Sequence, residues 1–368
     1  MSDEDSTGRL LTLVITTSPT LSAPSTGLLS TLLDSIRAHC ALLFKCKVIV
    51  VFDAWEQITT QPRLKKGQVT QKSAQDYLVY KGNVKKLFLE KYLRRALDDT
   101  KLTTGTGEAE YGSPGSNAIK PVAFTTSSTQ CRQVTFIEAV DQRLGFGLAV
   151  RTALRMVQTP YTWVHQHDWA LIYDIPIVSL LAVMRGAETD ASKPDVKYIC
   201  LPSGHRASYA TSDQVMRFPE LRKLAIALTG DFSVAAGDRP AVVPLTPMFF
   251  WHDKPHIVST AHYLARVFPT RLAMMRGAFI EDTIGQKARD QMKAGEWTKW
   301  ATWQFNPDEG RQPCLKHLHG RTWRGAAEEA RIKKAHRERN AAAMRQVVDA
   351  PKGATAMSSD LSASLATV

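Results

Sequence analysis

Four short groups of polar residues could carry chemistry in this chain. They are Asp53, the tripeptide Gln166-His167-Asp168, the acidic pair Glu281 and Asp282, and the pair His317 and His319. Carboxylates hold hard divalent cations and take protons from hydroxyl groups, whereas imidazoles bind metals or transfer protons. Two histidines separated by one residue share one face of an extended segment. The sequence therefore offers groups for acid–base or metal-assisted chemistry.

Asp53 follows a pattern that predicts a βαβ unit. Residues 10–17 (LLTLVITT) and 47–52 (KVIVVF) are short apolar runs typical of buried parallel strands, and residues 27–43 between them have a helical period. Open α/β sheets place ligand contacts at the carboxyl ends of their central strands, so Asp53 is predicted to lie at a ligand site. No G-x-G-x-x-G motif follows the first strand, which argues against a dinucleotide-binding dehydrogenase.

The following pattern predicts further alternation of strands and helices. We expect strands at residues 133–139, 161–165 and 196–201, and helices at residues 145–157 and 176–185. Residues 103–128 are rich in Gly, Ser, Thr and Pro, which predicts a long mobile loop. Residues 1–9 and 351–368 combine small polar side chains with few large apolar ones, so we expect a flexible N-terminus and a disordered tail.

Composition excludes several classes of protein. The chain has 368 residues, of which 44% are hydrophobic and 22% charged, as expected for a globular protein. Its five cysteines are widely spaced, which argues against a disulfide framework or a zinc site. No apolar run approaches the roughly 20 residues of a membrane span, and the N-terminus lacks a signal-peptide pattern. We expect a cytoplasmic protein, with docking at the cytosolic face of a membrane left open.

The net charge of +12 is concentrated in two segments, residues 62–101 and 316–345. In the second segment, acidic residues alternate with basic ones at helical spacing, which predicts a solvated basic helix at 326–350. Basic segments can bind nucleic acid, but no interleaved aromatic residues accompany these charges. Nucleic acid is therefore not the expected partner.

The order of these features resembles the GT-A fold glycosyltransferases, in particular family-2-like enzymes that use nucleotide-diphospho-sugars. The chain shows a strand, a helix, a strand ending in Asp53, a basic insert, a strand, the helix GFGLAVRTAL, a strand ending in QHD, and then FIED and KHLHG. The resemblance covers residues 10–325, with an insert at 56–130. It implies an α/β fold with an open, mostly parallel twisted sheet flanked by helices, followed by the basic helix.

The resemblance also implies a donor site with a divalent metal ion. The implied donor-nucleotide residues are Thr16, Thr17, Ser18, Asp53, Arg151, Gln166 and His167. The metal-binding DxD motif of the family falls on residues 166–168, where Gln166 replaces the first acid and leaves Asp168 as the only carboxylate. His317 and His319 are the other implied metal ligands. The metal would be Mn²⁺ or Mg²⁺, and the neighbouring imidazole of His167 favours Mn²⁺. Alternatively, Asp168 caps a turn and the two histidines are structural.

The resemblance further implies transfer to an acceptor hydroxyl with inversion. Asp282, with Glu281 as the alternative, would be the base that takes the acceptor proton. An acidic pair in the first turn of a helix can instead stabilise the helix dipole. Trp251, His252 and Asp253 would form an acceptor platform, although aromatic residues beside prolines are equally typical of a core. The acceptor could be a glycan, a protein, a lipid or a small molecule.

Two other functions remain open at this stage. A sugar-phosphate nucleotidyltransferase has a related sheet but needs a Gly-rich basic loop after its first strand, and the loop SPTLSAPSTG has no Lys or Arg. A non-catalytic basic binding protein with a degenerate transferase fold would explain Gln166 in place of an acid. Release of pyrophosphate would identify the first, and salt-sensitive RNA binding the second.

Overall fold

The computed structural model describes residues 3–61, 65–93, 100–113, 116–204, 212–236, 239–271 and 273–348. The chain divides into two compact units, Met1–Trp323 and Arg324–Val368. The predicted disordered tail and the basic residues Arg63, Arg94 and Arg95 lie outside the described residues.

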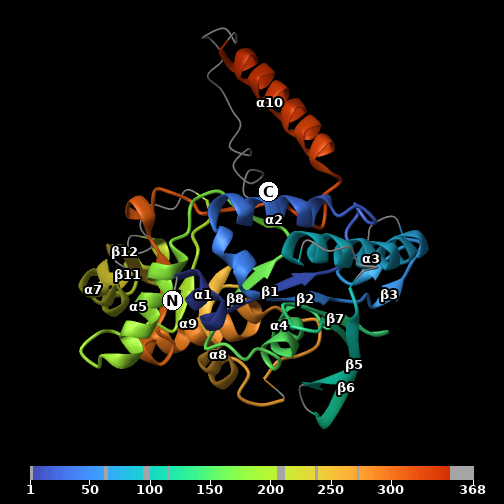
Figure 1. Cartoon of the computed structure of the whole chain (residues 1–368). Coiled ribbons are helices and arrows are strands. Elements are labelled where there is room, and N and C mark those ends of the chain that lie inside the picture. The colour runs from blue at the N-terminus through green and yellow to red at the C-terminus, as the bar shows by residue number, and fades with distance from the viewer. Residues whose placement is uncertain are drawn as a thin grey trace. The chain divides into compact units, whose positions relative to one another are not determined.

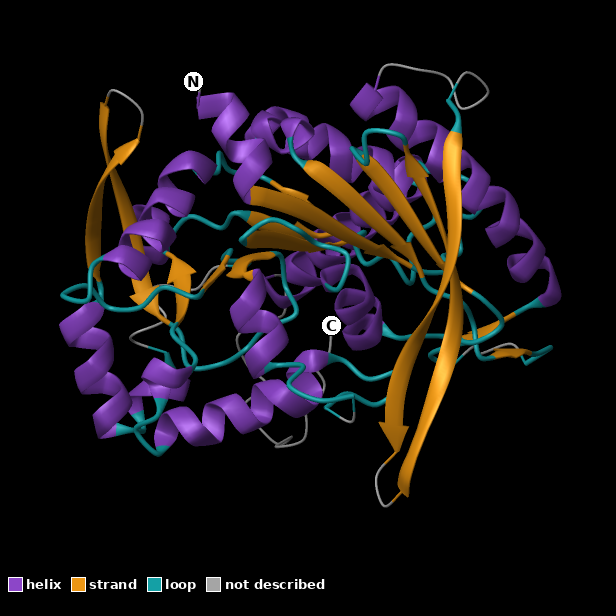
Figure 2. Ribbon diagram, turned by 60° about the horizontal axis from the view of Figure 1, so that its bottom comes forward, coloured by secondary structure: helices purple, strands orange, loops and turns teal. Residues whose placement is uncertain are grey.

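The larger unit is built on one long sheet (Figures 1 and 2). Within the described residues, its eleven strands lie in the order β11-β12-β14-β10-β13-β8-β1-β2-β7-β6-β5. Their bounds are β1 Leu11–Thr17, β2 Lys47–Phe52, β5 Leu102–Ser113, β6 Ser116–Thr129, β7 Val134–Ala139, β8 Tyr161–Gln166, β10 Tyr198–Cys200, β11 Gly230–Ala236, β12 Arg239–Pro247, β13 His256–Ser259 and β14 Thr302–Phe305. Two small sheets pair β3 Gln57–Ile58 with β4 Gln68–Val69, and β9 Trp169–Leu171 with β15 Leu315–His317.

The central strands β7, β2, β1 and β8 are parallel, and antiparallel strands extend the sheet on both sides. The predicted α/β fold with an open sheet flanked by helices is confirmed. All seven residues of β1 are buried, which explains its continuous apolar and β-branched run. Because Thr16 pairs with Gln166 and Thr17 with Phe52, strands β8, β1 and β2 end side by side.

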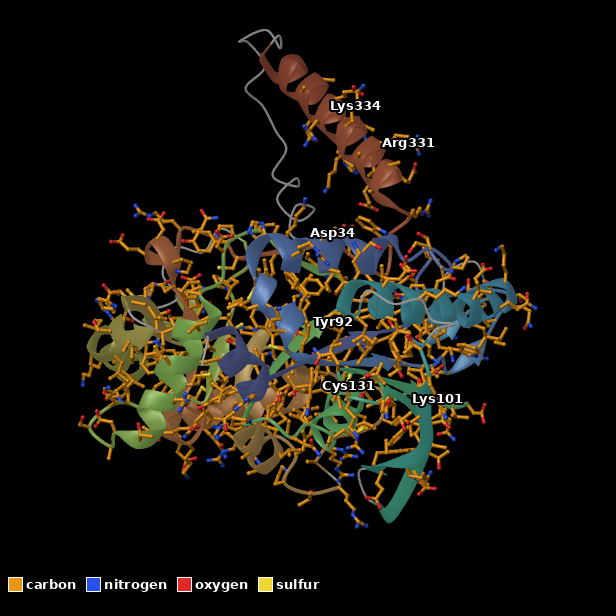
Figure 3. All side chains as sticks on the ribbon, in the orientation of Figure 1. Asp34, Tyr92, Lys101, Cys131, Arg331 and Lys334 are labelled. Carbon is orange, nitrogen blue, oxygen red and sulfur yellow. The ribbon has the colours of Figure 1, made fainter. Side chains whose placement is uncertain are left out.

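Helices flank the sheet (Figure 1). Their bounds are α1 Asp3–Leu10, α2 Gly27–His39, α3 Gln71–Leu93, α4 Phe146–Leu154, α5 Ile177–Thr189, α6 Asp213–Met216, α7 Pro219–Leu228, α8 Thr260–Arg266 and α9 Gln286–Lys293. Shorter turns are the 3₁₀ segments Ala41–Lys45, Trp297–Lys299 and Pro307–Gly310 and the π-helical segment Glu281–Gly285. An ion pair of 3.0 Å joins Lys91 of α3 to Asp34 of α2, the residue labelled on α2 in Figure 3.

Two expectations about flexible segments were wrong. Residues 103–128 belong almost entirely to the long hairpin β5–β6, and β6 continues the sheet by pairing with β7 from Phe124 to Ser128. The threonines that made this segment look polar are β-branched and favour strands, and this preference prevailed over the Gly and Ser content. The N-terminal residues, expected to be flexible, form α1 from Asp3, and Thr7 within it is buried.

The smaller unit contains the predicted basic helix, α10 Ala326–Val348. Arg331, labelled in Figure 3 with Lys334, donates to Glu328 at 2.7 and 2.8 Å, as the alternating charges predicted. Among the described residues of both units, no helix has the length and apolar character needed to cross a membrane.

Candidate active site

The ends of strands β1, β2 and β8 bring the predicted donor residues together. The backbone N–H of His167 donates to the carbonyl of Thr16 at 3.0 Å, and the N–H of Asp53 donates to the carbonyl of Thr17 at 2.8 Å. Ser18 follows and is half-buried. Thr16, Thr17, Asp53 and His167 therefore occupy one edge of the sheet, where ligands bind in open α/β folds.

A buried chain of hydrogen bonds runs through this edge. The hydroxyl of Thr17 lies 2.8 Å from Nδ1 of His167 and 3.0 Å from the hydroxyl of Tyr80 on α3. Tyr80 is fully buried, Thr17 is 2% exposed and His167 is 8% exposed. Sequence reasoning missed Tyr80, because nothing in a helical pattern shows which buried hydroxyl faces a strand end.

Asp168 lies at the centre of a second set of contacts. Its Oδ2 accepts hydrogen bonds from Nε2 of His317 at 3.1 Å and from the backbone N–H of Gly320 at 3.2 Å. Burial by itself would raise the pKa of Asp168, but the hydrogen bond from His317 and the neighbouring His167 lower it to about 2. Asp168 is therefore a carboxylate at neutral pH.

The segment that carries the two histidines is held against Asp168 by its own strand. β15 pairs with β9 so that His317 lies opposite Trp169, and the N–H of Leu318 donates to the carbonyl of Asp168 at 2.7 Å. His319 has a positive φ of 55°, and its ring centroid lies 4.4 Å from that of His317. The predicted metal ligands Asp168, His317 and His319 thus lie together.

Side-chain packing also holds this segment in place. Leu318 and Trp323 pack with Leu28 of α2 and Ala170 of β9 in a small hydrophobic cluster. Gly320 leaves no space for a side chain, since a Cβ there would lie 2.8 Å from Cβ of Asp168 and 3.0 Å from Nε2 of His167. The turn after His319 is therefore pressed directly onto His167 and Asp168.

These residues fit a divalent cation in part. Oδ1 of Asp168 is buried and has no hydrogen-bond partner among the described residues, as a metal-binding oxygen would be before the ion binds. Within the described ranges, however, no group of three or more His, Cys, Asp or Glu side chains could hold a metal ion. Asp168 and His317 therefore fit a cation that takes its other ligands from a bound anion or from water.

Asp53 has a structural role that its position did not predict. Its carboxylate accepts hydrogen bonds from the backbone N–H groups of Ala54, Leu144 and Gly145 at 2.6–3.0 Å, and Nε of Arg143 lies at 3.5 Å. Burial raises its pKa to about 6, although Arg143 and these N–H groups act in the opposite direction. Asp53 thus ties β2 to the start of α4.

Two other predicted donor residues make contacts with protein groups. The side-chain amide of Gln166 donates to the carbonyl of Asp253 at 2.8 Å. Arg151 is 1% exposed, and its Nη1 donates to the carbonyl of Arg271 at 3.1 Å, so the structure places this guanidinium in the interior between α4 and the segment at 271. Gln166 therefore joins β8 to Asp253, which in turn contacts Glu281.

The acidic segment consists of residues 280–282 with Asp253 hydrogen-bonded to it, and its three carboxylates have different contacts. Oδ2 of Asp253 accepts from the N–H groups of Ile280 and Glu281 at 3.1 and 3.3 Å, while Oε2 of Glu281 accepts from the N–H of Asp253 at 3.3 Å. Nδ1 of His252 lies 3.6 Å from the same Glu281 oxygen and lowers its pKa. Asp282 is exposed, and its side chain accepts no hydrogen bond from the described part of the chain.

The predicted acceptor platform is only partly accessible. Trp251 is 0% exposed and packs against Tyr198, Tyr263 and Trp300, so its indole belongs to the core and the expectation of a stacking face was wrong. Burial and the charge of Glu281 raise the pKa of Asp253 well above its ordinary value. His252 remains half-buried beside Glu281.

Two basic residues near the acidic segment, Lys66 and Arg143, were not predicted to belong to the site, and Arg321, which follows the KHLHG segment, lies near them. Nζ of Lys66 lies 3.6 Å from the ring centroid of Phe279. Burial lowers the pKa of Lys66, the charges of Arg143 and Arg321 lower it further, and Asp282 and Asp253 raise it. These four charged groups therefore lie close enough to Lys66 to act on it, although they come from distant parts of the sequence.

A cavity of about 380 Å³ lies elsewhere in the larger unit. It is lined by Thr12, Lys47 and Thr135 at the amino ends of β1, β2 and β7, together with residues of the β5–β6 hairpin. None of the predicted site residues lines it.

The chain matches no protein-family model and no curated protein. Among solved structures it is similar to residues 1–349 of TarS from S. aureus in complex with UDP-GlcNAc, with 9% identity and a TM-score of 0.34 over 69% of this chain and 46% of that one. A second structure of TarS 1–349 has 8% identity and a TM-score of 0.39, over 83% and 59%. The mannosyltransferase PcManGT from Pyrobaculum calidifontis, in complex with GDP-Man and Mn²⁺, has 14% identity and a TM-score of 0.34, over 83% and 60%. The chain thus spans 46–60% of the length of these structures.

Proposed function

We propose that this protein is a glycosyltransferase that moves a sugar from a nucleotide-diphospho-sugar to an acceptor hydroxyl. The observation that carries the proposal is the pairing of Asp168 with His317 at the edge where β1 and β8 end. The carboxylate is ionised, its buried Oδ1 has no hydrogen-bond partner in the described part of the chain, and Thr17 and His167 lie beside it. This arrangement suits a phosphorylated ligand bound with a cation.

The basic residues support an anionic donor. Lys66, Arg143 and Arg321 add positive charge close to the acidic segment, and a diphosphate leaving group carries negative charge that must be offset as the glycosidic bond breaks. Asp168 and His317 are the residues that would hold a divalent cation, which would neutralise further charge on the departing diphosphate. Mn²⁺ suits a mixed carboxylate and imidazole set better than Mg²⁺.

Asp282 is the proposed general base. The base must reach the acceptor hydroxyl, and Asp282 is exposed with a carboxylate that no described hydrogen bond engages. Glu281 is held by Asp253 and His252, which suits a role in fixing the segment. Removal of the acceptor proton by a carboxylate, with direct attack on the anomeric carbon, gives inversion of configuration.

Binding and turnover would test this function separately. We expect titration calorimetry to show binding of UDP or GDP in the presence of Mn²⁺, and incubation with a panel of nucleotide sugars to release nucleoside diphosphate. Asp168→Asn keeps the shape of the side chain but removes its charge, and should weaken binding of the diphosphate with Mn²⁺ at least tenfold. If the wild-type protein binds no nucleoside diphosphate or nucleotide sugar, the proposed function is wrong.

A further inference from the structure

The side chains of Tyr80, Thr17 and His167 form a buried chain of hydrogen bonds. Thr17 is the central member, 3.0 Å from the Tyr80 hydroxyl and 2.8 Å from Nδ1 of His167. The three side chains come from α3, β1 and the segment after β8, and the described residues provide no other side-chain partner for any of them.

Each hydroxyl has a single hydrogen to donate but can accept two hydrogen bonds, so these three side chains can be arranged in three ways. In the first arrangement, Tyr80 donates to Thr17 and Thr17 donates to Nδ1 of His167, which places the proton of a neutral imidazole on Nε2. In the second, Nδ1–H donates to Thr17 and Thr17 donates to Tyr80. The hydrogen of the Tyr80 hydroxyl then has no acceptor among the described residues. In the third, Tyr80 and Nδ1–H both donate to Thr17, and the hydrogen of the Thr17 hydroxyl has no acceptor among these residues.

The three arrangements differ in cost. Tyr80 is 0% and Thr17 2% exposed, so an unused hydroxyl hydrogen on either residue cannot donate to bulk water. A buried donor without a partner costs about 1–3 kcal/mol, which favours the first arrangement by roughly a factor of five or more. If His167 were protonated, both nitrogens would carry hydrogens, so Nε2 is a donor in that state too.

Nε2 of His167 faces the turn that also touches Asp168. A Cβ built on Gly320 would lie 3.0 Å from this nitrogen and 3.2 Å from Oδ2 of Asp168. His167 makes no described hydrogen bond through Nε2 and keeps 8% of its surface exposed. The donor hydrogen is therefore available to a ligand bound beside Asp168.

We propose that Tyr80, acting through Thr17, holds His167 as an Nε2–H donor that binds an oxygen of the diphosphate and does not coordinate the metal. Tyr80 is then a positioning residue, and the binding part of the proposal rests on the proposed function. The imidazole next to Asp168 acts on the anion directly, while Asp168 and His317 are the metal-facing pair.

The tautomer can be measured in the full-length protein without any ligand. Long-range ¹H–¹⁵N correlation spectra of ¹⁵N-labelled protein distinguish Nε2–H from Nδ1–H imidazole, and His167→Gln identifies the signals of this residue. We expect the Nε2–H form in the wild type and a shift toward the other tautomer in Tyr80→Phe. Thr17→Ser, which retains the hydroxyl, should restore the wild-type pattern relative to Thr17→Val.

A matched control removes a neighbouring buried hydroxyl. Tyr77 stacks on Tyr80, and its hydroxyl donates to the carbonyl of Asp53 at 2.8 Å, away from His167. Tyr77→Phe should therefore leave the His167 tautomer unchanged. A wild-type Nδ1–H tautomer, or an unchanged tautomer in a folded Tyr80→Phe variant, would overturn the role assigned to Tyr80.

Ligand binding tests the second half of the proposal. Calorimetry with UDP and GDP in EDTA removes the metal contribution, and Tyr80→Phe should then weaken binding about three- to tenfold. If Tyr80→Phe weakened binding of the nucleotides only in the presence of Mn²⁺, His167 would be a metal ligand, and this result would contradict the proposal. If wild-type protein binds neither nucleotide even with Mn²⁺ present, the proposed function and the diphosphate role both fail, while the spectra still decide the tautomer.

Discussion

Nε2 of His317 lies 3.1 Å from Oδ2 of Asp168, although 149 positions separate the two residues in the chain. The pairing of β15 with β9 brings them together, because β9 begins at the residue after Asp168 and β15 ends at His317. The pairing of these two short antiparallel strands therefore places an imidazole beside a carboxylate at the end of β8. This relationship is the structural basis of the donor site proposed above.

Removing His317 should weaken binding of a nucleoside diphosphate with Mn²⁺. His317→Ala deletes a candidate metal ligand and the hydrogen bond that lowers the pKa of Asp168, so we expect a loss of about 10–100-fold in Mn²⁺-dependent affinity. Titration calorimetry with and without Mn²⁺ measures it. His336→Ala changes an exposed histidine on α10 and is the control, with affinity expected to be unchanged. Wild-type affinity in His317→Ala would remove this residue from the site.

The two acidic residues should differ in their effect on turnover. Asp282→Asn should lower kcat about 10²–10⁴-fold with little change in donor affinity, because the base acts on the acceptor hydroxyl. Glu281→Gln should alter the segment mainly through its contacts to Asp253 and His252. Steady-state transfer rates and donor affinity measured on both variants separate these effects. The reverse result, with Glu281→Gln inactive and Asp282→Asn active, would make Glu281 the base.

A methyl group at position 320 should damage the site more than the fold. Gly320→Ala places a Cβ 2.8 Å from Cβ of Asp168, so the turn or the carboxylate must move. We expect donor affinity to fall at least tenfold and stability to fall by about 1–3 kcal/mol. Gly82→Ala is the matched control, because nothing lies within 4 Å of a Cβ there and alanine favours the helix α3. Its stability should rise by about 0.5–1 kcal/mol.

An ion-pair cluster should make the stability of the larger unit depend on acid pH. Glu138 of β7 lies 2.9 Å from Nζ of Lys81 and 2.5 Å from Nζ of Lys85 on α3. Burial alone would raise its pKa, but the hydrogen bonds from Lys85 and Lys81 lower it below 4.5 in the folded state. A depressed folded-state pKa contributes stability above the unfolded-state value, and this contribution is lost as pH falls below about 4.5.

Glu138→Gln should remove this contribution. We expect it to lower the free energy of unfolding at pH 7 by about 1–3 kcal/mol, and to leave a smaller difference from wild type near pH 3. Urea unfolding at a series of pH values gives both quantities. A difference between the two proteins that stays constant from pH 7 to pH 3 would show that Glu138 is not ionised in the folded protein.

Local pattern predicted the elements best where one side chain type dominates. The runs that became β1 and β2 are rich in apolar and β-branched residues on both faces, so their state depends little on distant contacts. The hairpin β5–β6 was missed because its polar composition resembles that of a loop, whereas its two strands pair with each other and β6 also pairs with β7. Trp251 was wrongly assigned to the acceptor platform, because the sequence shows that a tryptophan is large and apolar but not whether its ring is buried.

The sequence by itself determined that acidic and imidazole groups follow strands of an α/β sheet, since strand periodicity and the residue after each strand are local properties. Only the tertiary structure decided which of these groups meet. His317 reaches Asp168 through a ladder between distant segments, and Tyr80 contacts His167 through Thr17. Asp53 accepts hydrogen bonds from the backbone just before α4. Contacts over such separations depend on how loops and helices pack across the sheet edge, and that packing is fixed by the whole core.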